Sequence, residues 1–228
     1  MRKPADILAI AFILFLIGVY LFLPHTLNKE EGKLLPTDQS TEIDTDNISA
    51  PEKIIEPLKV SEFQSPLDQA AKRVTKKPFG IWIDSQTSPV QPENFSGYHT
   101  GTDFEIFPEE TETEVTVRAV CSGKLIAKKY ATGYGGVAVQ SCTLDNNPIT
   151  IIYGHLKLIS LEKETGERLV GGDPIGVLGK GFSAETDGER KHLHLGFHQG
   201  MNINILGYVS NKKDLSAWID PCLYLCEK

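Results

Sequence analysis

The chain has 228 residues, of which 40% are hydrophobic and 23% are charged. That length is enough for one well-packed core with appended segments, and the hydrophobic content excludes a wholly disordered chain. The formal net charge of −7 argues against nucleic acid as the main partner, because phosphate backbones attract positively charged surfaces.

The N-terminal segment differs from the rest of the chain. Residues 7–23 read ILAIAFILFLIGVYLFL, an apolar run without a charge, and a helix of that length is about 25 Å long, near the short end of what spans a bilayer. Arg2 and Lys3 precede the run, so the positive-inside rule predicts that residues 1–6 are cytoplasmic and the remainder extracytoplasmic. No small-residue cleavage site follows, which favours an uncleaved single-pass anchor in the cytoplasmic (inner) membrane over a signal peptide.

Residues 24–60 connect this segment to the remainder of the chain. They contain more acidic than basic side chains and show little periodicity, which predicts a flexible, solvated tether between the membrane and a domain over 61–228. Near the start of that domain, SPLDQAAKRV can form a short helix with Ser65 as its cap, and Pro78 ends the pattern.

Short β-branched or alternating runs dominate the rest of the chain, separated by Gly, Pro, Asn or Asp. No long amphipathic helix pattern follows residue 75. The sequence therefore predicts a mainly β fold, a compact antiparallel β-sheet domain. The runs are TEVTVRAV, GKLIAKKY, GGVAVQSC, ITIIYGHL, PIGVLGKG and KHLHLGFH.

Four cysteines are consistent with an oxidising compartment, and the absence of a C-x-x-C pair argues against a zinc ribbon. Cys121 and Cys142 fall in two neighbouring predicted strands, where a disulfide would stabilise the fold by about 3 kcal/mol in the chain-entropy model. Cys222 and Cys226 lie near the C-terminus. Pairing does not follow from sequence alone, and four free, buried thiols are the alternative.

Three of the six histidines lie within GERKHLHLGFHQG. The alternation of KHLHLGFH predicts a strand with His192 and His194 on one face and Leu193, Leu195 and Phe197 on the opposite, buried face. Two histidines on one strand face suit a metal or acid–base site, although exposed polar residues would give the same pattern.

Upstream, GYHTGTDFEI places His99 and Asp103 four residues apart, which is the same face of an extended segment. Imidazole and carboxylate are zinc ligands, and a catalytic zinc needs three protein ligands and an open position. His99, Asp103 and either His192 or His194 would make such a set, and His155 in IIYGHLKL could complete the site. A non-haem iron triad uses the same residue types. A structural zinc site would need a fourth ligand.

The segments HTGTD, YGHL and HLHL, in that order, resemble the signature of peptidase family M23, the LytM or lysostaphin-type zinc metallopeptidases. GYGGVAVQ, GDPIGVLGKGF and IDPCLYL resemble other segments of the family, so the resemblance covers roughly residues 80–226. It implies a compact antiparallel β domain with a metal-binding groove that holds one Zn²⁺ ion.

The resemblance also implies roles for individual residues. It makes His99, Asp103 and His194 the zinc ligands. It makes His155 and His192 the two non-ligand catalytic histidines, and leaves open which of them is the general base.

The function that the resemblance implies is zinc-dependent endopeptidase activity on cross-links or stem peptides of bacterial peptidoglycan, at the periplasmic or cell-wall side of the membrane. The alternative is a catalytically inactive LytM-type domain that binds peptidoglycan or activates a cell-wall amidase. Such domains usually lack at least one of the five site residues, all of which are present here. The cleaved bond, the oligomeric state and any regulatory protein partner do not follow from the sequence.

Several residues depart from the family pattern or lie outside it. Gly196 stands where many members have glutamate, and residues 183–190 are charged where many members have a small turn; we expect the charged loop to alter substrate contacts rather than the metal site. His198 matches no motif residue and is expected at the surface. Tyr98 and Tyr134 are candidates for the groove, with packing at a turn as the alternative.

Overall fold

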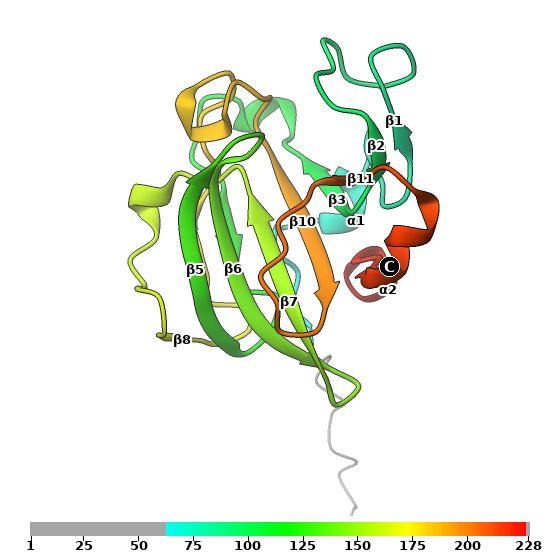
Figure 1. Ribbon diagram of the computed structural model, residues 1–228. Helices are drawn as coiled ribbons and strands as arrows, with labels where there is room; N and C mark the ends of the chain where they lie inside the picture. Colours follow the sequence, from blue (N-terminus) through cyan, green and yellow to red (C-terminus); the bar gives the residue numbers. More distant parts are fainter. Residues whose placement is uncertain (1–62, 227–228) are drawn as a thin grey trace, which may run out of the picture. The chain divides into compact units, whose positions relative to one another are not determined.

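An antiparallel β-sheet of seven strands forms the centre of the structure (Figure 1). The computed structural model describes residues 63–226. The sheet runs in the order β12–β10–β7–β6–β5–β8, and β3 pairs with β10. The predicted mainly β, antiparallel class is therefore confirmed. The strand bounds are β3 Gly101–Glu105, β5 Gly123–Ala131, β6 Gly135–Leu144, β7 Asn147–Gly154, β8 Arg168–Leu169, β10 His192–Gln199 and β12 Trp218–Ile219.

Two smaller sheets and several short helical segments surround this sheet. One sheet has the order β1–β2–β11, and the other pairs β4 with β9. The bounds are β1 Trp82–Ile83, β2 Gly97–His99, β4 Thr116–Arg118, β9 Pro174–Val177, β11 Tyr208–Val209, α1 Ala70–Arg73, α2 Cys222–Leu225, η1 Pro108–Glu110, η2 Leu158–Ser160, η3 Ala184–Thr186 and η4 Lys212–Ala217.

Alternate residues of β10 face opposite sides of the main sheet. Leu193, Leu195 and Phe197 are completely buried in the larger hydrophobic cluster, which confirms the alternation predicted from the sequence. The histidines between them face the other side, where Tyr134 and Trp218 belong to a smaller cluster. The apolar face of β10 therefore packs on the main core, and its histidine face lies on the opposite side of the sheet.

The β6–β7 hairpin determines where His155 lies. Its two-residue turn is formed by Asp145 and Asn146, whose φ angles of 49° and 63° suit these residue types better than most. The register pairs Val137 with Gly154, the last residue of β7. His155 then leaves the sheet in the left-handed conformation, with φ 63°.

The segment in which a short helix was predicted is helical for one turn only, α1. The residues before it pair with another part of the chain, because the Arg118 N–H donates to the Pro66 carbonyl oxygen at 2.9 Å. The Pro66 carbonyl oxygen therefore accepts a hydrogen bond from another segment and not from a helical turn that begins at Ser65. The predicted helix start at Ser65 is wrong.

Both cysteine pairs are joined as disulfides, Cys121 to Cys142 and Cys222 to Cys226. The first connects the segment before β5 to β6. Beside it, Gln140 Nε2 donates to the Cys121 carbonyl oxygen at 2.7 Å, so the polar backbone at this buried position is satisfied.

The predicted anchor at 7–23 and tether at 24–60 lie outside the described residues. Within residues 63–226, no helix is long and apolar enough to cross a membrane.

Candidate metal centre and catalytic groove

The HTGTD segment passes from one sheet to another. His99 ends β2 of the three-stranded sheet, whereas Asp103 lies in β3, which pairs with β10. Thr100 makes the transition: its N–H donates to the Gly207 carbonyl oxygen at 3.0 Å, and its hydroxyl donates to the Leu206 carbonyl oxygen at 2.5 Å. The segment is thus not one continuous strand, yet His99 Nε2 and Asp103 Oδ1 are 3.2 Å apart.

The register of β10 brings the later histidines to the same place. His194 is paired with Asp103 on one side and with Gly154 on the other. His192 is paired with Glu105. Directly opposite residues of antiparallel strands share a face and lie close together, so the two histidines and two carboxylates form one row.

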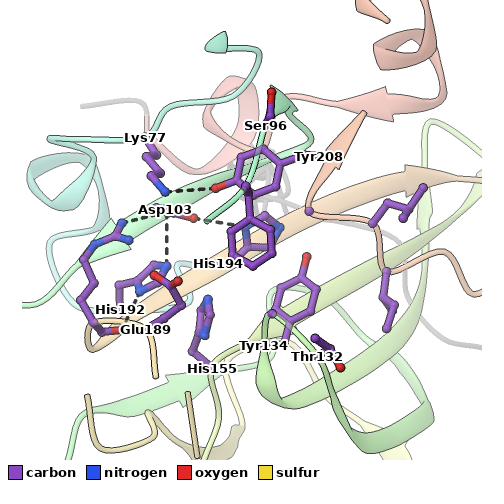
Figure 2. A pocket seen from close by; sticks show the side chains of 16 residues that line it. Lys77, Ser96, Asp103, Thr132, Tyr134, His155, Glu189, His192, His194 and Tyr208 are labelled. Atoms are coloured by element: carbon purple, nitrogen blue, oxygen red, sulfur yellow. Dashed lines mark hydrogen bonds and ion pairs between the residues drawn. The ribbon is translucent and has the colours of Figure 1, made fainter. Parts of the chain in front are cut away.

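Three potential ligand atoms meet at one point. His99 Nε2 is 3.0 Å from His194 Nδ1. Asp103 Oδ1 is 3.2 Å from His99 Nε2 and 3.1 Å from His194 Nδ1. All three side chains are buried, and together they form a group that could hold a metal ion. Figure 2 shows Asp103 and His194 directed toward one another.

The contacts of these side chains fit a bound cation. His99 Nδ1 lies 3.2 Å from the Pro78 carbonyl oxygen, which can only accept, so Nδ1 can donate there while Nε2 is directed at the ligand group. Burial lowers the pKa of His194 to about 4, which leaves its imidazole neutral at pH 7. Tetrahedral zinc ligands at about 2.0 Å from the metal lie about 3.3 Å apart. The 3.0–3.2 Å spacing of the three atoms is close to that value.

The carboxyl group of Asp103 is held in its ionised form. Burial raises its pKa, but the nearby imidazoles of His192 and His99 outweigh burial and keep the pKa well below its usual value. A buried carboxylate with a strongly perturbed pKa, in a groove beside several imidazoles, is typical of a functional site.

His155 and His192 lie next to the three candidate ligands, with their ring centroids 4.2 Å apart. Burial, together with the His192 imidazole, lowers the pKa of His155 well below its usual value, so His155 is neutral at pH 7. Both ring nitrogens of His192 face oxygen atoms: Nδ1 is 2.9 Å from the Arg190 carbonyl, and Nε2 is 3.2 Å from Asp103 Oδ2. The five residues proposed from the sequence therefore converge on one site.

The site lies in a groove of about 380 Å³, a size typical of ligand-binding clefts. Figure 2 shows Tyr134 and Tyr208 at the groove, with Lys77 beside Tyr208. The Lys77 ammonium donates to the Tyr208 hydroxyl at 3.1 Å and to Glu93 Oε2 at 2.6 Å. The Tyr134 hydroxyl is buried and has no hydrogen-bond partner among the described residues.

Two residues beside the site were missed by the sequence reasoning. Arg190 Nη2 donates to Asp103 Oδ2 at 2.8 Å, and Arg190 Nε is 3.0–3.1 Å from both carboxylate oxygens of Glu105. Arg190 belongs to the charged loop 183–190, whose expected effect was on substrate contacts. The loop instead contacts a candidate metal ligand. The sequence does indicate this position, because residue 190 is two and four residues from His192 and His194 and so shares their strand face.

The expectations for the two tyrosines and for His198 can also be compared with the structure. Tyr134 lines the groove, whereas Tyr98 packs edge-on against Trp82. The surface position expected for His198 is wrong: the side chain is buried, packs edge-on against Trp218, and accepts a hydrogen bond from Asn204 at 3.3 Å.

Replacing Gly101 with alanine is expected to disrupt the metal centre. A Cβ atom there would lie 2.5 Å from the Leu195 carbonyl oxygen and 2.7 Å from Nε2 of His194, closer than nonbonded atoms approach. To relieve both clashes, the β3–β10 backbone at Leu195 and the His194 ring must shift. Zinc content per chain, measured by atomic emission after purification, should fall well below one.

The matched control is Gly196→Ala on the partner strand, directly opposite Gly101. Its Cβ would be 3.4 Å from Trp218 and 3.6 Å from His194 Nε2, which is ordinary contact, so zinc should be retained. Full zinc content in Gly101→Ala would show that the His194 ring does not depend on this close approach.

Residues 97–205 match the model of peptidase family M23. No curated protein matches the chain. Among solved structures, the chain is similar to the catalytic domain of the antimicrobial peptidase lysostaphin from Staphylococcus simulans, with 19% identity over 72% of this chain and 100% of that chain, at a TM-score of 0.46.

Two further solved structures are similar to the chain. One is Csd3 from Helicobacter pylori, with 18% identity over 73% of this chain and a TM-score of 0.44; the match spans 35% of the Csd3 chain. The other is a chain of the SpoIIIAH–SpoIIQ complex, with 14% identity over 72% of this chain and 99% of that chain, at a TM-score of 0.46. On the family match, residues 97–205 belong to a domain of peptidase family M23.

Proposed function

We propose that this chain is a zinc-dependent endopeptidase that hydrolyses peptide bonds in bacterial peptidoglycan. The observation that carries the proposal is the convergence of His99 Nε2, Asp103 Oδ1 and His194 Nδ1 within 3.2 Å of one another. Two further imidazoles, neither of them in the ligand group, lie beside this convergence in the same groove. A closed structural site would need a fourth ligand, and the group contains three residues.

His99, Asp103 and His194 would hold the ion. When bound, zinc supplies a water of lowered pKa and polarises the scissile carbonyl. The remaining chemistry belongs to the chain's own residues, which must orient the substrate, accept one proton and stabilise the charge that develops on the carbonyl oxygen.

His155 suits the role of proton acceptor. It is neutral at pH 7 because burial lowers its pKa, and it lines the groove. His192 suits the role of donor, because Nδ1 and Nε2 both face oxygen atoms, which accept hydrogen bonds. A donor at this position can stabilise the oxyanion or protonate the leaving amine.

The test is incubation of the zinc-loaded full-length protein with purified peptidoglycan, followed by mass spectrometry of the released fragments. Peptide-bond cleavage that a zinc chelator abolishes and added zinc restores would support the proposal, and the fragment masses would identify the bond. Zinc-loaded protein that binds peptidoglycan without releasing fragments would support the inactive, binding alternative instead. If that protein raised the activity of an added amidase, its role would be activation.

We further propose that residues 7–23 anchor the chain in the cytoplasmic membrane, with residues 24–60 as the tether that places the peptidase domain on the cell-wall side. The apolar run and the preceding Arg2 and Lys3 support this orientation. Protease added to intact spheroplasts should degrade the domain and spare a tag at the N-terminus. Protection of the domain would contradict the orientation.

A further inference from the structure

Arg190 is a buried guanidinium directly beside the candidate metal centre. It lies in the segment between η3 and β10 and is 8% exposed. Its Nη2 donates to Asp103 Oδ2 at 2.8 Å and to Glu105 Oε1 at 2.5 Å. Burial lowers the pKa of Arg190, but the Asp103 and Glu105 carboxylates outweigh burial and raise the pKa above its usual value, so the guanidinium is charged.

The contacts of Asp103 divide between its two oxygens. Oδ1 faces His99 Nε2 and His194 Nδ1, the atoms with which it would share an ion. Oδ2 faces Arg190 Nη2 and His192 Nε2 instead. A carboxylate oxygen that accepts a charged hydrogen bond at 2.8 Å is engaged and oriented away from the ligand group.

Glu105 is a second carboxylate on the same face. It is two residues from Asp103 on β3, and its side chain is 10% exposed. Arg190 binds both of its oxygens through Nε, and Lys76 lies 3.4 Å from Oε2. Without Arg190, the buried carboxylates of Asp103 and Glu105 would lie on one strand face, with the half-exposed Lys76 as the remaining cation beside Glu105 among the described residues.

We propose that Arg190 is a positioning residue that restricts Asp103 to one coordinating oxygen and keeps Glu105 out of the metal site. A catalytic zinc site needs an open position for water, and a bidentate aspartate or an additional glutamate would occupy it. The guanidinium thus lowers the affinity for the metal and keeps one coordination position open. The inference rests on the proposed function only in that His99, Asp103 and His194 are taken as the metal ligands.

The test compares metal binding by the full-length parent and by Arg190→Met, each freed of metal and titrated with Co²⁺ and with Zn²⁺ against a chromophoric chelator. We expect the variant to bind metal more tightly by about tenfold, opposite in sign to the loss of affinity that usually follows removal of a group next to a metal ligand. The visible bands of bound Co²⁺ should weaken as its coordination number rises. Peptidoglycan hydrolysis should fall although the metal is bound.

The matched control is Arg73→Met. Arg73 is a buried guanidinium that pairs through two nitrogens with Glu110 and donates to the Glu105 carbonyl oxygen, but it forms no hydrogen bond or ion pair with the carboxylate of Asp103 or Glu105. Its metal affinity should equal that of the parent. Damage to the fold alone would weaken metal binding in either variant, so tighter binding is a result that a merely structural role cannot produce.

A second variant covers the case in which Arg190→Met does not fold. Arg190→Met/Glu105→Met removes the guanidinium together with its main partner, and replacing both members of a buried ion pair with apolar residues is often neutral for stability. It also leaves His192 Nε2 as the one remaining partner of Asp103 Oδ2 among the described residues and removes the charged hydrogen bond, so metal binding should again tighten. Unchanged or weaker metal affinity in the folded variant would overturn the inference. These readouts do not depend on hydrolysis, so failure of the parent to cleave peptidoglycan would be a separate result.

Discussion

Replacing His194 with alanine is expected to abolish metal binding and peptidoglycan hydrolysis together. Its Nδ1 lies 3.0 Å from His99 Nε2 and 3.1 Å from Asp103 Oδ1, so its removal leaves two ligands at the site. Two ligands bind zinc far more weakly than three, and the loss should exceed tenfold in affinity. Zinc per chain and fragment release from the same preparation measure both effects.

The matched control for this variant is His198→Ala. His198 lies four residues further along β10, on the same face, but it packs against Trp218 instead of the ligand group. This variant should keep its zinc. Retention of one zinc per chain by His194→Ala would contradict the ligand assignment.

Replacing His155 with asparagine is expected to separate catalysis from metal binding. Asparagine tolerates the left-handed backbone at this position, where φ is 63°, and it lacks a basic nitrogen. His155 is not one of the three ligands, so zinc content should not change. Loss of a positioned general base should lower the hydrolysis rate by about 10²–10⁴-fold.

The measurement is the initial rate of fragment release at saturating zinc, with the melting temperature as a check that the fold is intact. An Asn variant with the parent's rate would remove His155 from the mechanism. A variant that loses its zinc would instead make His155 a ligand or a support for one.

Local alternation was enough to predict the strands and the two faces of β10, because side chains two residues apart share a face whatever the strand pairs with. It could not predict that HTGTD changes sheets at Thr100, since that depends on hydrogen bonds to residues about a hundred positions away. The closeness of His99 and Asp103 follows from this transition rather than from a shared strand face.

The two errors of interpretation near the site have different physical origins. Arg190 is an even number of residues from His192 and His194, which predicts the same strand face, but it lies outside the short family motifs. The burial of His198 had no local signal. It comes from Trp218 and Asn204, which reach the strand from segments later in the chain.

The passage of HTGTD between sheets also has a thermodynamic consequence. His99 belongs to the three-stranded sheet, whereas Asp103 and His194 belong to the seven-stranded sheet, so a shared ion would crosslink the two. Part of the free energy of metal binding would then stabilise the contact between the two sheets. Tyr208, in β11, lines the groove from the smaller sheet. Metal supply would therefore govern the assembly of the substrate cleft as well as the chemistry within it.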